Sequence, residues 1–221
     1  MKVRLLALAL LLAFPVTAAH AQTDKLIQFI IDNSSALRNP QQGAAAYGGI
    51  LLFKARELQG VAGRNAKVHI VTTHNPRTIY DGEARNLFPD LQRIVAPQIK
   101  HQPAGCNQLG EAIERVRAHI ARHAVKEVEV YVISSLIPTG APCKNLRIRL
   151  PQPIPSNVDY QSLVQPETTV LQFFWADRQQ ETVWGKAIEA SGLLERIRNQ
   201  NVDFAIRGED STRQYIADQI R

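Results

Sequence analysis

The sequence predicts an α/β fold: a three-layer, doubly wound, mainly parallel six-stranded sheet with one antiparallel edge strand. Strand-like runs alternate with helix-like segments along the chain, which favours parallel strands with helices on both faces. One tight connection, at Asn75-Pro76, joins two strand-like runs directly, so the second of them is expected to be antiparallel. The apolar run Leu26–Ile31 ends in Asp32, followed at once by small hydroxyl residues, as at the carboxyl end of a buried parallel strand.

Six runs have the apolar character and length of strands. The first is continuous enough to be buried on both faces, and the third is short and follows the turn. In chain order they are 25–31 (KLIQFII), 66–73 (AKVHIVTT), 77–80 (RTIY), 127–134 (EVEVYVIS), 168–176 (TTVLQFFWA) and 202–207 (VDFAIR).

Helical periodicity fills the intervals. Ala44–Gln59 carries apolar residues on one face and is followed by Gly60, and Leu109–His123 repeats the pattern. A shorter helical piece is expected within 88–99. Asp177 is predicted to cap a helix that runs to about Arg198, with Gln180 placed for a capping box. Ser211 is predicted to cap the last helix.

The N-terminus has the pattern of a secretory signal peptide. Lys2 and Arg4 precede the apolar run Leu5–Val16, and Ala19-His20-Ala21 supplies small residues for cleavage before Gln22. The apolar run is too short for a spanning helix. We therefore predict a signal peptide over residues 1–21 and a single domain over 22–221, periplasmic or secreted, without a membrane span.

Charge and cysteine content narrow the class of protein. The formal net charge is +6, and removing Lys2 and Arg4 leaves a mild positive charge that is no signature of nucleic-acid binding. Cys106 and Cys143 are the two cysteines of the chain. In an oxidising compartment such a pair usually forms one disulfide, and the alternative is a reactive thiol with a histidine partner.

The stretch 137–165 departs from the alternating rhythm. It is rich in proline, and the segment Lys144–Leu150 alternates polar with apolar residues, so an extra extended strand outside the core is expected there. A long insertion of this kind either carries function or decorates the fold, and the sequence leaves both possibilities open.

Several catalytic or metal-binding patterns are incomplete. His119 and His123 have the i, i+4 spacing of zinc ligands, but Ile120 stands where a metalloprotease has glutamate. A basic, solvated helix face is the simpler expectation, made of Arg115, His119, Arg122 and Lys126. His69 is expected to be a satisfied residue within its strand. Trp175 and Trp184 are expected to pack in the core.

The strand order, the antiparallel hairpin and the end of the first strand resemble a von Willebrand factor type A (vWA) domain. Such domains often hold a divalent cation with an Asp-x-Ser-x-Ser motif, which here is Asp32-Asn33-Ser34-Ser35-Ala36. Asn107 stands where the family has a threonine. Ser135 stands where it has a second aspartate. The resemblance therefore implies a degenerate metal-ion-dependent adhesion site formed by Asp32, Ser34, Asn107 and Ser135.

The resemblance also carries expectations about ligands. Only one of the four site residues is charged, so we expect no functional metal and at most weak binding of Mg²⁺, which prefers carboxylate oxygens. The alternative is that Asp32 and Ser34 only hydrogen-bond loop backbone. The resembled fold places Cys106 and Cys143 on neighbouring loops above the sheet, which implies a disulfide between them.

The sequence and the resemblance thus predict an exported, non-enzymatic protein–protein interaction module of the vWA type, with an envelope or secretion assembly as its expected setting. Its partner is expected to be a protein that binds the face around Asp32. Two alternatives remain at this stage. One is a small exported hydrolase that uses Asp32, although Asn33-Ser34 offers no second acid nearby. The other is a purely structural subunit. The oligomeric state is open.

Overall fold

The computed structural model describes residues 23–36, 40–98, 105–139, 143 and 148–220. The predicted signal peptide, residues 1–21, lies outside the described residues, as does most of the Lys144–Leu150 segment. The described remainder of that segment, 148–150, is not a strand.

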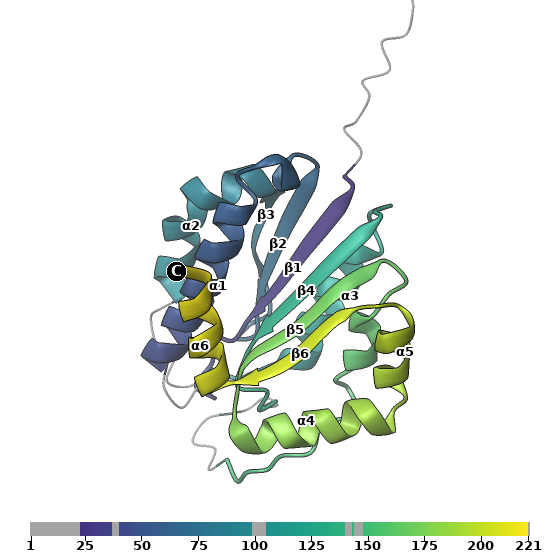
Figure 1. Ribbon diagram of the computed structural model, residues 1–221. Helices are drawn as coiled ribbons and strands as arrows, with labels where there is room; N and C mark the ends of the chain where they lie inside the picture. Colours follow the sequence, from purple (N-terminus) through teal and green to yellow (C-terminus); the bar gives the residue numbers. More distant parts are fainter. Residues whose placement is uncertain (1–22, 37–39, 99–104, 140–142, 144–147, 221) are drawn as a thin grey trace, which may run out of the picture.

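A single sheet organises the domain, in the order β3-β2-β1-β4-β5-β6 (Figure 1). All neighbours run parallel except β3, which is antiparallel to β2 at one edge. This confirms the predicted fold class, a Rossmann-like doubly wound arrangement. The strands are β1 (Lys25–Ile31), β2 (Ala66–Thr72), β3 (Thr78–Glu83), β4 (Glu127–Ile133), β5 (Thr168–Ala176) and β6 (Asp203–Gly208).

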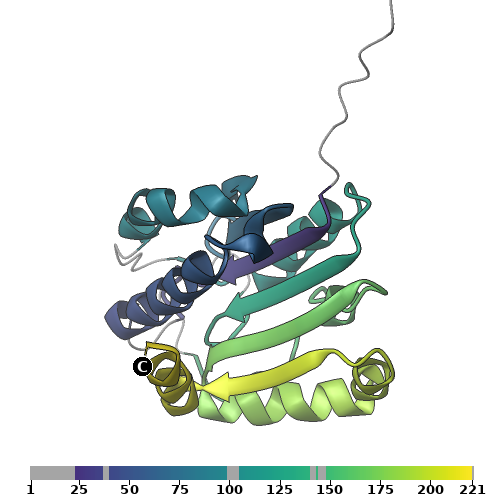
Figure 2. The same cartoon turned by 45° about the horizontal axis from the view of Figure 1, so that its top comes forward.

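Two apolar clusters fill the space between the sheet and its helices. One packs under α1 (Pro40–Glu57), α2 (Leu87–Val95) and α6 (Glu209–Ile220), and the other under α3 (Leu109–Ile120), α4 (Arg178–Ala190) and α5 (Leu193–Asn199). Each cluster takes alternate residues of the strands, because successive side chains in a strand point to opposite faces. The result is a three-layer domain (Figure 2).

Helix ends differ from the sequence-based expectations at two places. The helix expected from Asp177 to about Arg198 is interrupted by Gly192, whose left-handed φ of 73° separates α4 from α5. Asp177 does cap α4, accepting a hydrogen bond from the Gln179 N–H. Gln180 does not complete a capping box, because its amide donates to the carbonyls of Leu136 and Gln152 instead.

The first and last helices start earlier than predicted. α1 begins at Pro40 rather than Ala44, where proline suits the first helical turn. α6 begins at Glu209, so Ser211 lies within its first turn and donates to the Gly208 carbonyl. The prediction of Ser211 as the cap was therefore wrong. Trp175 and Trp184 are both buried, as predicted.

Candidate functional site

Asp32 follows β1 at the carboxyl edge of the sheet and is fully buried. Its Oδ1 accepts hydrogen bonds from the Ser34 N–H at 3.0 Å, the Ser34 hydroxyl at 2.6 Å and the Thr73 hydroxyl at 3.1 Å. The bonds from Ser34 form a local turn around the carboxylate. The bond from Thr73 ties this turn to the end of β2.

The second carboxylate oxygen binds the other side of the site. Oδ2 accepts from Asn107 Nδ2 at 2.9 Å, from the Ser134 hydroxyl at 2.9 Å, and from the Ser135 hydroxyl and N–H at 3.2 and 3.3 Å. The structure therefore brings together all four residues of the sequence-derived site. Thr73 and Ser134 complete it.

Thr73 and Ser134 were missed because each had been placed as the last residue of a predicted strand. The signal was available: both are small hydroxyl residues at the carboxyl end of a strand beside β1. In a parallel sheet those ends meet at one edge, where ligands and polar networks collect.

This network surrounds Asp32 with uncharged hydrogen-bond donors. The hydroxyl groups of Ser34, Ser134 and Ser135 donate to the carboxylate, so Asp32 bonds side chains of several loops as well as its own loop backbone. Both carboxylate oxygens are occupied within the protein. Across the described residues, no group of three or more His, Cys, Asp or Glu side chains is arranged to hold a metal ion.

A disulfide braces the loops beside Asp32. Cys106 and Cys143 are joined, with their Cα atoms 5.4 Å apart, so the alternative of a reactive thiol is wrong. On the same loops, the Asn107 N–H donates to the Thr139 hydroxyl at 2.6 Å and the Thr139 N–H returns a bond to the Asn107 carbonyl at 2.9 Å. The Cys106 N–H donates to Nδ1 of His74 at 3.1 Å, which links this loop to the end of β2.

Backbone strain gathers at the same edge. Asn75, Leu136 and Trp175, at or just after the ends of β2, β4 and β5, have φ values of 47°, 57° and 66°. A left-handed backbone is unfavourable for a leucine or a tryptophan. Strain of this kind tends to be retained where a loop must hold a particular shape for function.

A pocket of about 240 Å³ opens beside the network, between the N-terminal end of α3 and the proline-rich segment. Asn107 lines it, and so do the more accessible Gln108 and Glu111. Asp32 is not among its lining residues. The crevice thus borders the buried carboxylate without exposing it.

Two buried histidines and a half-buried one form a cluster that the sequence did not predict. His119 is 1% exposed, so its assignment to a solvated face was wrong. Its ring stacks on that of buried His69 with centroids 3.9 Å apart, and the half-buried His123 ring lies 4.6 Å from it. His69 is satisfied within its strand, as predicted.

The amide of Gln28 bridges the two buried rings. Gln28 Nε2 lies 3.1 Å from Nδ1 of His119, and Gln28 Oε1 lies 2.8 Å from Nδ1 of His69. The Thr78 hydroxyl lies 2.9 Å from Nε2 of His69, and Oδ2 of Asp81 lies 3.4 Å from Nε2 of His119. Burial lowers the pKa of both rings, which favours the uncharged form of each imidazole. Burial, with His119 as a secondary cause, lowers the pKa of His69 from 6.5 to about 4.

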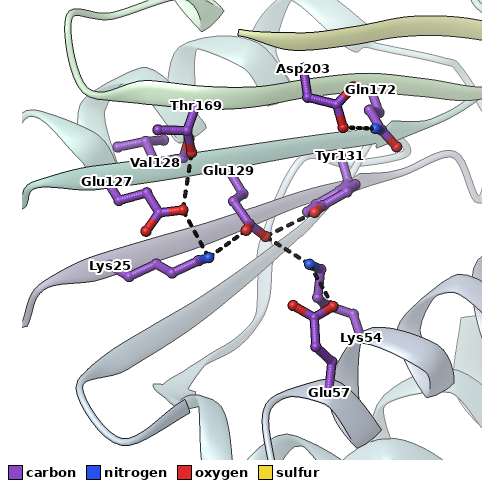
Figure 3. Close-up of polar contacts among 10 residues, drawn as sticks. All are labelled: Lys25, Lys54, Glu57, Glu127, Val128, Glu129, Tyr131, Thr169, Gln172 and Asp203. Atoms are coloured by element: carbon purple, nitrogen blue, oxygen red, sulfur yellow. Dashed lines mark hydrogen bonds and ion pairs between the residues drawn. The ribbon is translucent and has the colours of Figure 1, made fainter. Parts of the chain in front are cut away.

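A second buried carboxylate, besides Asp32, lies on the face of the sheet that α1 covers. Glu129 of β4 is 4% exposed. It contacts Lys25 at 2.5 Å and Lys54 at 3.0 Å, and accepts the Tyr131 hydroxyl at 2.8 Å (Figure 3). Burial alone would raise the pKa of Glu129, but the two ammonium groups outweigh burial and hold that pKa below its ordinary value.

Comparisons with known proteins concern the fold. No family model matches this chain, and no curated protein sequence does. Among solved structures, the pilus adhesin SpaC from Lactobacillus rhamnosus GG is similar at 12% identity and a TM-score of 0.53, over 90% of this chain and 29% of SpaC.

Two further solved structures are similar to this chain with lower TM-scores. A D319A mutant of the PilB minor pilin from Streptococcus sanguinis has 10% identity and a TM-score of 0.49, over 93% of this chain and 62% of PilB. The vWF domain of the type V pili tip protein Mfa5 from Porphyromonas gingivalis has 12% identity and a TM-score of 0.38, over 50% of this chain and 37% of that domain structure.

This chain spans less than two thirds of the length of each of these structures. Within the described residues, no helix combines the length and the apolar character needed to cross a membrane. The likeness to SpaC is one of fold: a doubly wound α/β domain with a mainly parallel sheet.

Proposed function

We propose that this protein is an exported, non-enzymatic protein-binding module of the vWA type. Its binding surface would be the top face, defined here as the loops around Asp32, Ser34, Asn107 and Ser135 with the adjoining pocket at Gln108 and Glu111. The carrying observation is that Asp32 is buried and both its oxygens accept hydrogen bonds from the protein.

This arrangement argues against the hydrolase alternative. A carboxylate nucleophile or general base must reach a substrate atom within hydrogen-bond distance. Asp32 is 0% exposed, and an approaching substrate would have to displace donors from Ser34, Asn107 or Ser135. Asp32 is therefore better placed to hold the loops in position than to act as a catalytic residue.

The same arrangement supports a role in presenting a surface. The disulfide, the Asn107–Thr139 bonds and the network around Asp32 connect the ends of β1, β2 and β4 to the loop before α3. A surface that is rigid before binding loses less conformational entropy when a partner docks. SpaC, which shares the fold, is a pilus adhesin, so we extend the proposal to a role in adhesion or pilus assembly, outside the cytoplasm.

A matched pair of charge reversals tests the surface. Glu111 and Glu195 are both exposed glutamates in the first turn of a helix. Glu111 borders the top face. Glu195 lies in α5, which precedes the N-terminal end of β6, away from the top face. The mature protein would be used as bait in envelope or cell-surface extracts, with bound proteins identified by mass spectrometry. We expect Glu111→Lys to reduce capture of the main partner at least several-fold and Glu195→Lys to leave it unchanged.

Both variants should keep the wild-type melting temperature, since each residue is on the surface. Equal capture by Glu111→Lys and wild type would contradict the top-face assignment. Turnover of ester, phosphate or peptide substrates that is abolished by Asp32→Asn would contradict the non-enzymatic proposal.

A further inference from the structure

Strand β6 is the last strand of the sheet. Among the residues that the structure describes, it pairs with β5 on one side and with no strand on the other, which leaves one edge of its backbone open. Every residue of Asp203–Gly208 is exposed or partly exposed, whereas all residues of β1 and β4 after the first are buried. Figure 2 shows β6 as the outermost strand. An open edge presents unpaired N–H and C=O groups, which are a template for another strand.

The faces of β6 are covered even though its edge is open. Phe204 and Ile206 pack against the apolar cluster that contains Trp184 of α4, and α6 contacts β6 on the other face. A partner that approaches β6 would therefore meet mainly backbone and the side chains that border the edge.

The sequence of β6 is complementary to itself in the antiparallel direction. If two copies pair around a two-fold axis at Ala205, then Asp203 of each lies opposite Arg207 of the other, and Phe204 lies opposite Ile206. Opposite charges and aromatic–aliphatic pairs directly across two strands are favourable. A two-fold axis makes every contact occur twice.

The side chains already lie on the face that this pairing requires. Gln172 of β5 donates to Asp203 at 2.6 Å through Nε2 and accepts from Arg207 at 3.3 Å through Oε1. Figure 3 shows Asp203 and Gln172 side by side on that face. The small residue Ala205 stands between the acid and the base, so a second strand would meet no bulky side chain at the axis.

The other edge of the sheet lacks this property. β3 has the sequence TIYDGE, with two acidic residues, Asp81 and Glu83, and no basic one. Pairing two β3 strands would bring four carboxylates together with no basic residue from β3 opposite them, although Arg85 pairs with Glu83 within each chain; such a strand opposes self-association.

We propose that two copies of this chain associate through antiparallel pairing of their β6 strands, which joins the two sheets across a two-fold axis. The contact lies along the side of the sheet and leaves the top face of both copies free. One strand pair buries little area, so the dimer forms in a concentration-dependent way rather than as an obligate unit.

Charge exchange tests the register. Sedimentation equilibrium of the mature protein should show a monomer–dimer equilibrium. Asp203→Arg alone and Arg207→Asp alone should each weaken dimerisation at least tenfold, because each places like charges opposite one another. An equimolar mixture of the two variants should recover a heterodimer, and the double variant D203R/R207D should recover a homodimer.

A cysteine at the axis tests the geometry independently of charge. Opposite residues in an antiparallel pair have Cα atoms about 4.5–5.5 Å apart, within the range for a disulfide. Under mild oxidation Ala205→Cys should give a covalent dimer, while Val61→Cys, at a position 75% exposed elsewhere on the surface, should stay mainly monomeric at the same concentration.

Arg207 also lies over the rings of Phe174 and Tyr215, at 5.1 and 4.7 Å, so melting temperatures of the charge variants should be recorded alongside. A wild-type protein that stays monomeric at high concentration would overturn the proposal. Dimers insensitive to the charge reversals, or Ala205→Cys that cross-links no faster than Val61→Cys, would overturn it equally.

Discussion

Asp32 and Glu129 are both carboxylates buried at the central strands, but they are stabilised in opposite ways. Asp32, at the carboxyl edge, accepts hydrogen bonds from uncharged groups only among the partners described. Glu129, on a face of the sheet, is held by the ammonium groups of Lys25 and Lys54. The uncharged donors around Asp32 come from several loops, and their directional hydrogen bonds hold those loops in position. Ion pairs compensate the charge itself, and they offset the cost of burial only when their geometry is good.

The largest effect is expected where a buried ion pair is broken. Glu129→Ala would remove the buried carboxylate that Lys25 and Lys54 share and leave them with the more exposed partners Glu127 and Glu57. Breaking a buried pair costs about 3–5 kcal/mol of unfolding free energy, and the two remaining partners place the expected loss at the lower end, about 3 kcal/mol. Urea denaturation measures it. The matched control is Glu127→Ala, since Glu127 also contacts Lys25 but its side chain is 39% exposed. A change of less than about 1 kcal/mol is expected there.

Loss of Glu129 costing no more than loss of Glu127 would contradict the assignment of a buried ion pair. In that case the two carboxylates would be equally hydrated, and the contrast with Asp32 would have no energetic basis.

A smaller effect is expected at Asp32. In Asp32→Asn one carboxylate oxygen becomes an NH₂ group that faces hydroxyl and amide donors. The cost is about 1–3 kcal/mol, since hydrogen bonds rather than ion pairs are lost. Urea denaturation gives the comparison, with Asn33→Ala as a reference that removes the bonds to Gln98 and His74 but none to Asp32. A loss at Asp32 larger than that of Glu129→Ala would contradict the ordering of the two sites.

The histidine cluster predicts a pH dependence of stability. The folded-state pKa of His69, about 4, lies below its ordinary value of 6.5, so between these values the unfolded chain binds more protons than the folded one. Stability is therefore complete above pH 6.5 and falls as the pH decreases toward 4. The slope is at most about 1.4 kcal/mol per pH unit for this proton.

Thermal unfolding across this pH range should show the slope in wild type and a flatter profile in His69→Gln, which cannot take up that proton. An identical profile for the two proteins would contradict the pKa assigned to His69. Glu129 also contributes at the acidic end of the profile. Its pKa in the folded protein is below the ordinary value of 4.5, so its contribution to stability is lost as the pH falls below 4.5.

The sequence predicted the fold well because its signals were local. Alternating apolar runs and one tight turn were enough to predict the sheet and its antiparallel edge. The site residues Asp32, Ser34, Asn107 and Ser135 were grouped through the resemblance to a vWA domain. The disulfide between Cys106 and Cys143 was expected from the oxidising compartment and from the resemblance to a vWA domain.

The features that were missed depend on partners far along the chain. His119 lies three positions after Val116, at the helical spacing of a buried residue, but its polar side chain suggested exposure to solvent. Its burial is stabilised by contacts with Gln28 and His69, which lie on adjacent strands. Glu129 was not singled out in the sequence; it stands in a predicted strand, and its buried partner Lys54 comes from α1. Such long-range pairing is not encoded in local periodicity.

The most direct test of the central claim is a calorimetric titration of the mature protein with Mg²⁺ and Mn²⁺. If neutral donors organise the top face in place of a cation, no site tighter than about 1 mM is expected, since Asp32 is the only formal carboxylate among the site residues and its oxygens are occupied. A micromolar site in the wild type that is lost in Asp32→Asn would contradict the claim and indicate a metal-dependent adhesion site.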